Sequence, residues 1–100
     1  MNPWAGEVAV VVDGQALNVR LTLGALAALE AELGMESLAD LAARFDHGQV
    51  KAADVAAVLR AGLRGGGHQV DLMTAEIGGG VTEAARVAAR LLARAFALPE

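Results

Sequence analysis

Apolar and polar positions alternate with a period of two in the first part of the chain. Valine occupies every second position over residues 8–12, and leucine and valine alternate with polar residues over 17–21. This pattern is typical of two strands that each bury one face. Asp13 and Gly14 lie between them, and an Asp-Gly pair readily adopts the positive φ angles of a type I′ turn. The pattern therefore predicts a β-hairpin.

A two-residue turn fixes the register of this hairpin. It places Val10 opposite Leu17 on one face and Glu7 opposite Arg20 on the other, where opposite charges meet. Because an isolated two-stranded hairpin is only marginally stable, helices have to cover its valine face. We expect residues 8–34, the hairpin together with the helix that follows it, to organise the rest of the chain.

Helical spacing begins directly after the hairpin. Thr22 has the side chain of an N-cap, and Gly34 is a natural helix end. Between them, leucines recur at intervals of three and four residues, which predicts one apolar stripe on a helix facing the valines. The stripe consists of Leu23, Leu26, Leu29 and Leu33.

Capping and charge patterns predict further helices. Ser37 and Asp40 form the S-x-x-D pattern of a capping box before a short helix over 38–45. Asp54 suits the first turn of a third helix, because negative charge is favourable there. A glycine triplet at 65–67 then interrupts the chain.

The last part of the chain is less regular at first. Residues 70–77 predict one or two helical turns, and Thr82 is the expected N-cap of a final helix over 83–97. The predicted fold class is α+β and mostly α. It has an N-terminal β-hairpin followed by four helices, one of them short and weak, in a single domain over residues 1–100.

Composition and charge exclude several function classes. The chain has no cysteine, a formal net charge of −4 and a single lysine, Lys51. Such an acidic chain is poorly suited to neutralise several phosphates at once, so nucleic acid is not an expected partner. The longest uncharged run, over 21–29, is too short to span a membrane, and no basic segment precedes the first apolar residues. We expect a cytoplasmic bacterial protein that binds no membrane.

No residue pattern predicts catalysis, a metal or a cofactor. The glycine triplets at 65–67 and 78–80 lack the lysine and the flanking elements of nucleotide-binding loops. We interpret them as flexible connections between helices. His47 and His68 lack the spacing of metal ligands, so we expect them to be exposed to solvent. A small enzyme that uses one of these histidines remains an alternative hypothesis.

Arginines and the single tryptophan are the candidate partner-binding residues. Arginines at helical spacing could dock an acidic helix of a partner, and an exposed tryptophan would anchor an interface. The alternatives are a solvated helix face and a tryptophan that packs as a lid on the core. The candidates are Trp4, Arg60, Arg64, Arg86, Arg90 and Arg94.

Segments spread over nearly the whole chain resemble one protein family. Besides the hairpin they are NPWAGEV, LTLGALAALEAELG, SLADLAARF, AGLRGGG, AEIGGG and EAARVAARLLARAFALPE. Together they resemble the small tail assembly chaperone encoded in the tail cluster of alphaproteobacterial gene transfer agents, which are phage-like particles that package host DNA. The resemblance implies a non-enzymatic protein that binds the tape measure protein and helps recruit tail tube subunits during tail assembly.

A second hypothesis makes the chain a structural connector or tube-end component that is retained in the particle. In that role the edge of its hairpin would extend the sheet of a neighbour. Self-association is left open under both hypotheses.

Overall fold

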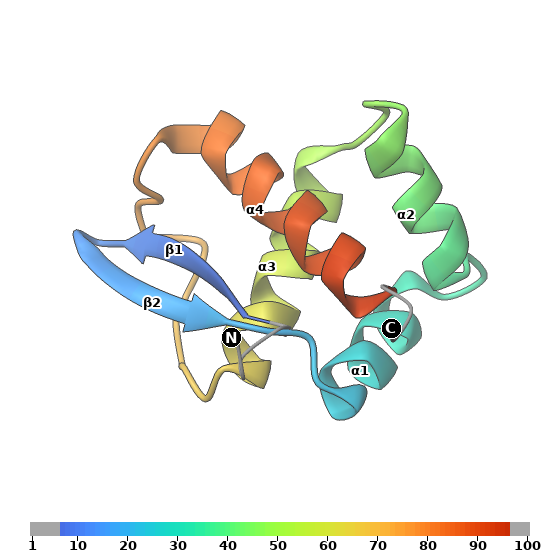
Figure 1. The fold of residues 1–100 in the computed structure, drawn as a ribbon, viewed down its shortest axis with the longest axis horizontal. Coiled ribbons are helices and arrows are strands. Elements are labelled where there is room, and N and C mark those ends of the chain that lie inside the picture. Colours follow the sequence, from blue (N-terminus) through green and yellow to red (C-terminus); the bar gives the residue numbers. More distant parts are fainter. Residues whose placement is uncertain (1–6, 97–100) are drawn as a thin grey trace.

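The computed structural model describes residues 7–96, which form an antiparallel hairpin followed by four helices (Figure 1). This confirms the predicted α+β, mostly helical fold class. The elements are β1 (Val8–Val12), β2 (Gln15–Val19), α1 (Leu23–Leu33), α2 (Leu38–Asp46), α3 (Ala52–Gly65) and α4 (Gly80–Ala95).

The hairpin has the register that its turn predicts. Val10 pairs with Leu17. Asp13 and Gly14 have φ angles of 51° and 80°, and a type I′ turn requires positive values at both positions. The local chemistry of the turn is therefore sufficient to set the strand pairing.

The expected pair of Glu7 and Arg20 lies beyond the last paired residues of the sheet. Arg20 instead contacts α3. Its backbone N–H donates to Gly62 O at 3.1 Å, and its side-chain Nε donates to Gly65 O at 3.3 Å. The end of β2 is thus held by the C-terminal half of α3.

The central element of the fold is α3. It packs against α1, α4 and β2, while β1 packs against α4. Each later helix contacts an element of residues 8–34, as expected, but α3 and α4, rather than α1, cover the valine face. The reason is that α3 buries small residues beside its larger apolar ones, so that it receives neighbours on several sides. Its buried residues are Val55, Ala57, Val58, Leu59, Ala61, Gly62 and Leu63.

Two glycines of α3 allow close approaches to its neighbours. A Cβ atom on Gly62 would lie 2.6 Å from Leu91 Cδ1 of α4, and one on Gly65 would lie 2.1 Å from Arg20 O of the chain after β2. Neither contact leaves room for a methyl group. Gly62 thus lies at a close helix crossing, whereas the triplet at 65–67 is a packed junction and not simply a flexible connection.

Polar caps begin α1 and α2 as predicted. Thr22 Oγ1 accepts from Ala25 N at 3.1 Å, and Ser37 Oγ accepts from Asp40 N at 3.1 Å. The Asp40 carboxylate accepts in return from Ser37 N at 3.4 Å, which completes the capping box. These side chains satisfy backbone donors that have no partner inside the helix.

The start of α4 differs from the prediction. The helix begins at Gly80 rather than at Glu83, so Thr82 lies inside its first turn and does not cap it. Gly79, with a φ of 86°, precedes the helix in a left-handed conformation that favours glycine. A glycine start carries no side-chain cap, so the sequence gives no polar signal for it.

Residues 70–77 make one hydrogen-bonded turn and no helix, which corrects the prediction of a short helical segment there. Ala75 N donates to Asp71 O at 3.0 Å. The chain then runs beside β1, where Gly78 N donates to Val11 O at 2.8 Å. The backbone groups that a longer helix would use are thus used by the strand.

Two large apolar side chains at helix ends are exposed, and one of them, Leu23, was expected to face the core. Leu23 is 83% exposed and Phe96 is 46% exposed. The buried residues of α1 are Ala25 and Leu29, which lie on the side of the helix opposite Leu23 at 100° per residue. Leu23 and Phe96 therefore both add a large apolar side chain to the surface.

Candidate partner-binding surfaces

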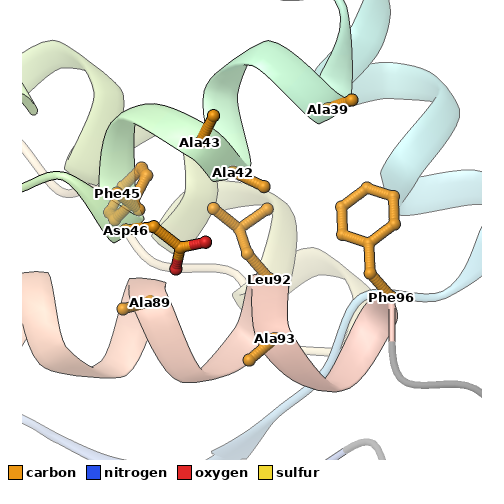
Figure 2. Close-up of a pocket in the computed structure, with 9 residues that line it drawn as sticks. All are labelled: Ala39, Ala42, Ala43, Phe45, Asp46, Ala89, Leu92, Ala93 and Phe96. Atoms are coloured by element: carbon orange, nitrogen blue, oxygen red, sulfur yellow. The ribbon is translucent and has the colours of Figure 1, made fainter.

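An apolar groove of about 370 Å³ lies between α2 and α4. Leu92 points from α4 toward α2, and the rings of Phe45 and Phe96 lie toward opposite ends of the groove (Figure 2). The groove is lined by Ala39, Ala42, Ala43, Phe45, Asp46, Ala89, Leu92, Ala93 and Phe96. Asp46 is the single charged residue of this lining, so the groove is a packing surface.

Alanines form much of the groove wall. Ala39 and Ala43 lie one turn apart on α2, and Ala89 and Ala93 lie one turn apart on α4 (Figure 2). Methyl side chains allow another backbone to approach closely, and helices that pack in contact lie with their axes about 8–10 Å apart. The groove therefore suits the apolar face of an incoming helix.

The three arginines predicted on the last helix are exposed along one flank of α4. Arg86 donates to Glu83 Oε1 at 2.9 Å in an i, i+3 ion pair. Arg90 and Arg94 follow at intervals of four residues and are exposed as well. Helical spacing places this flank beside Ala93, on the outer side of the groove. The arginines give that side of the groove a positive charge.

The arginines of α3 line a different hollow. Arg60 forms an ion pair with Glu32 of α1, while Arg64 is exposed. Both line a polar hollow with His68 and Asp71 after the helix. The arginine candidates therefore belong to two surfaces, and one of them already links α3 to α1.

Arg44 joins α2 to α3 through two carboxylates, a contact that the sequence analysis missed. Its Nε and Nη2 donate to Glu36 at 2.8 and 2.6 Å, and Nη1 donates to the Asp54 carboxylate at the start of α3. The hydrogen bond from Arg44 holds the pKa of Asp54 below its usual range, although partial burial opposes this. The same bond raises the pKa of Arg44. Sequence separations of eight and ten residues leave no periodic signal for this network.

The described residues 7–96 contain no group of three histidine, aspartate or glutamate side chains that could hold a metal ion. His47 is exposed at the end of α2. His68 is partly buried, contrary to expectation, and its Nε2 donates to Asn18 O of β2 at 3.0 Å. Over the same range, no helix has both the length and the apolar character needed to cross a membrane.

Both edges of the hairpin are partly occupied. Along β1, Gly78 N donates to Val11 O and Asp13 N donates to Glu76 O, each at 2.8 Å. Along β2, Asn18 O accepts from the ring of the histidine that follows α3. An incoming strand would find these backbone groups already used. This geometry disfavours the sheet extension expected of a connector.

The groove was not predicted from the sequence, although the sequence contains a signal for it. Ala39 and Ala43, and again Ala89 and Ala93, recur at one-turn spacing on the two helices. The spacing alone does not show which helices meet in the fold. Alanines at one-turn intervals therefore look the same in the sequence as those of an ordinary helix surface. Trp4 lies outside the described residues, and its role at an interface stays a prediction.

A protein-family model described as "Phage tail tube protein, GTA-gp10" matches residues 5–98. No curated protein and no solved structure matches the chain. The matched family is one of phage tail proteins and not a class of enzymes. Because the match covers nearly the whole sequence, the chain belongs to the phage tail tube protein family GTA-gp10, which links it to the tails of phages and gene transfer agents.

Proposed function

We infer that this chain is a non-enzymatic tail assembly chaperone that binds a helical segment of the tape measure protein and helps recruit tail tube subunits. Family membership supports a role in the tail. The apolar groove between α2 and α4 is the observation that carries the chaperone role. A protein that handles a partner during assembly needs an accessible surface for it, and amphipathic helices bind in grooves of this kind.

The character of the groove suggests which helix it would accept. Alanines on both walls favour a bound helix with an apolar stripe, and the exposed arginines on the α4 flank favour acidic residues beside that stripe. Such a helix would bury apolar area in the groove and place carboxylates near Arg86 and Arg90. Charges at the rim contribute more to selectivity than to affinity.

The second candidate is a tube component retained in the particle. Membership of a family of phage tail tube proteins favours it. In this role the chain would occur in finished particles at a fixed ratio to the other tail proteins. It would also have to use contacts other than the partly occupied hairpin edges.

A pull-down from producing cells separates the two candidates. A tagged chain would be isolated during particle assembly, and mass spectrometry would be applied both to the bound proteins and to purified finished particles. The chaperone role predicts tape measure peptides in the pull-down, no chain in the particles, and few or no tailed particles after deletion of the gene. The chain present in particles at a fixed ratio would favour the tube component, and normal particle numbers after deletion would exclude both.

A groove variant tests the surface directly. Ala93 is exposed on α4, so Ala93→Glu leaves the core unchanged but places a charge where an apolar stripe would pack. We expect capture of the tape measure protein to fall at least about tenfold, equivalent to about 1.4 kcal/mol. The matched control is Ala53→Glu, which adds the same charge in the exposed first turn of α3. Equal capture by both variants would remove the groove from the proposal.

A further inference from the structure

The outward face of α1 is apolar, which is unusual for a helix at the surface. Leu23 is 83% exposed and Met35, just after the helix, is fully exposed. Ala27 and Ala31, which lie between them at one-turn intervals, are exposed as well. A helix on the surface of a globular domain normally presents polar residues to solvent. We call Leu23, Ala27, Ala31 and Met35 the α1 face.

The buried side of α1 does not account for this face. Ala25 and Leu29 are the buried residues of the helix, and they turn toward α3 and α2. Leu23, Ala27 and Ala31 point the opposite way, and Met35 follows the end of the helix fully exposed, so no described element of the same chain covers the α1 face. Within residues 7–96, the α1 face and the groove between α2 and α4 are thus two apolar surfaces that no other described element covers, beside the exposed Met73 and Val81 near the start of α4.

The two surfaces have complementary charge. Glu30 and Glu32 are the charged residues of α1, which has no lysine or arginine. Three arginines and one glutamate are the charged residues of α4. Glu30 is exposed beside the α1 face, and the exposed arginines lie on the outer side of the groove. Opposite charges at the rims favour contact between the surfaces and fix its orientation.

We propose that the α1 face of one copy of this chain docks in the groove between α2 and α4 of a second copy. Ala27 and Ala31 pack against the alanine walls, which is the close approach that small side chains on both partners permit. Leu23 and Met35, at the two ends of the face, reach toward the ends of the groove where Phe45 and Phe96 lie. Thioether and aromatic groups pack favourably.

The charged residues at the rims set the rotation of the docked helix about its own axis. Asp46 lies on the α2 wall, so Glu30 of the docked copy faces away from it and toward Arg90 on α4. Two copies could instead place their grooves against each other. When such a contact brings the two α4 flanks together, arginines face arginines, so the contact lacks this charge complementarity. The α1 face, with its carboxylate, is the better occupant.

This contact joins two different surfaces, so each copy keeps one free groove or one free α1 face for another copy. Contacts of this head-to-tail kind build rings when the rotation between copies closes and helical filaments when it does not. The purified chain would form this contact by itself, whichever tail protein it also binds.

Two variants test the contact in purified protein. Ala93→Glu blocks the groove, and Ala27→Arg blocks the α1 face with bulk and with a charge that the arginines of α4 repel; both positions are exposed. Analytical ultracentrifugation should show the mass of the wild type rising with concentration, and each variant alone should stay monomeric. An equimolar mixture should form a 1:1 dimer that grows no further, because only one intact groove and one intact α1 face remain.

Circular dichroism and thermal unfolding would verify that both variants fold. If Ala27→Arg unfolds, Met35→Arg replaces it, since Met35 is fully exposed and the new charge is repelled by the arginines of α4. Ala53→Glu, outside both surfaces, should associate like the wild type. A wild type that stays monomeric at millimolar concentration would overturn the proposal. Variants that still self-associate would also overturn it. A mixture that remains monomeric would do so as well, because that result is expected of a symmetric contact.

Discussion

At the scale of single residues, Gly65 is the point where α3 meets the end of β2. An added Cβ would lie 2.1 Å from Arg20 O and 3.3 Å from Thr22 N. Both are backbone atoms, which cannot move aside alone. We expect Gly65→Ala to lower the free energy of unfolding by about 1–3 kcal/mol, the usual range for overpacking, even though alanine is the better helix former. Urea unfolding followed by circular dichroism measures this.

Gly24 in α1 provides the matched control. It also lies in a helix, has no positive φ, and a Cβ there would meet nothing within 4 Å. Gly24→Ala should therefore raise the free energy of unfolding by up to about 1 kcal/mol through helix propensity alone. If Gly65→Ala were as stable as the wild type, the contact between α3 and β2 would be looser than the structure indicates.

At the scale of elements, the ion pair of Arg44 and Asp54 ties α2 to α3 and makes stability depend on pH. The pKa of Asp54 is lower in the folded chain than in the unfolded chain. Its contribution to stability is therefore present above the ordinary aspartate pKa of about 3.9 and is lost as the pH falls through that value toward the folded one. We expect Asp54→Asn to be less stable than the wild type at pH 7, with the difference shrinking below about pH 4.

Urea midpoints measured between pH 2.5 and 7 test this prediction. Asparagine keeps an oxygen that can accept from Lys51 N, so the substitution removes mainly the charge. Glu76→Gln is the control, because the Glu76 side chain is exposed in the loop before α4. A constant difference between the wild type and Asp54→Asn over the whole pH range would mean that the carboxylate acts through packing and not through its charge.

The sequence was sufficient to predict those elements whose first or last residues are set by side chains close by in the chain. Asp13-Gly14 set the hairpin register, and Thr22 and Ser37 set the starts of two helices. Residues 70–77 could not be predicted, because their backbone groups are used by a strand more than 60 residues earlier in the chain. The central place of α3 also depends on contacts between distant elements, which local periodicity does not record.

The candidate surfaces were harder to predict than the fold. The arginines were chosen by residue type, and the structure distributes them over two surfaces and pairs Arg60 with Glu32. The groove depends on the meeting of α2 and α4, which lie far apart in the sequence. Leu23 illustrates the same limit, because a leucine at helical spacing was assigned to the core although the neighbouring elements pack on the other side of α1.

At the scale of the whole molecule, one groove cannot hold the α1 face of a second copy and a tape measure helix at the same time. Under the two proposals, self-association and partner binding would therefore compete, because each occupant removes the site for the other. A synthetic helical segment of the tape measure protein that binds the groove should dissociate the assembled chain into 1:1 complexes. Sedimentation of the mixture measures this change in mass.

The competition also sets how affinity depends on concentration. In the wild type, the apparent Kd for the segment should rise as the chain is concentrated, since self-association reduces the fraction of free grooves. Ala27→Arg keeps its own groove but has no α1 face to fill a neighbour's, so its Kd should be lower and independent of its concentration. If the two proteins gave the same Kd at every concentration, or if segment and assembled chain sedimented together, the two partners would use different surfaces. A groove that is covered by other copies until a tape measure helix displaces them would keep apolar surface protected before tail assembly begins.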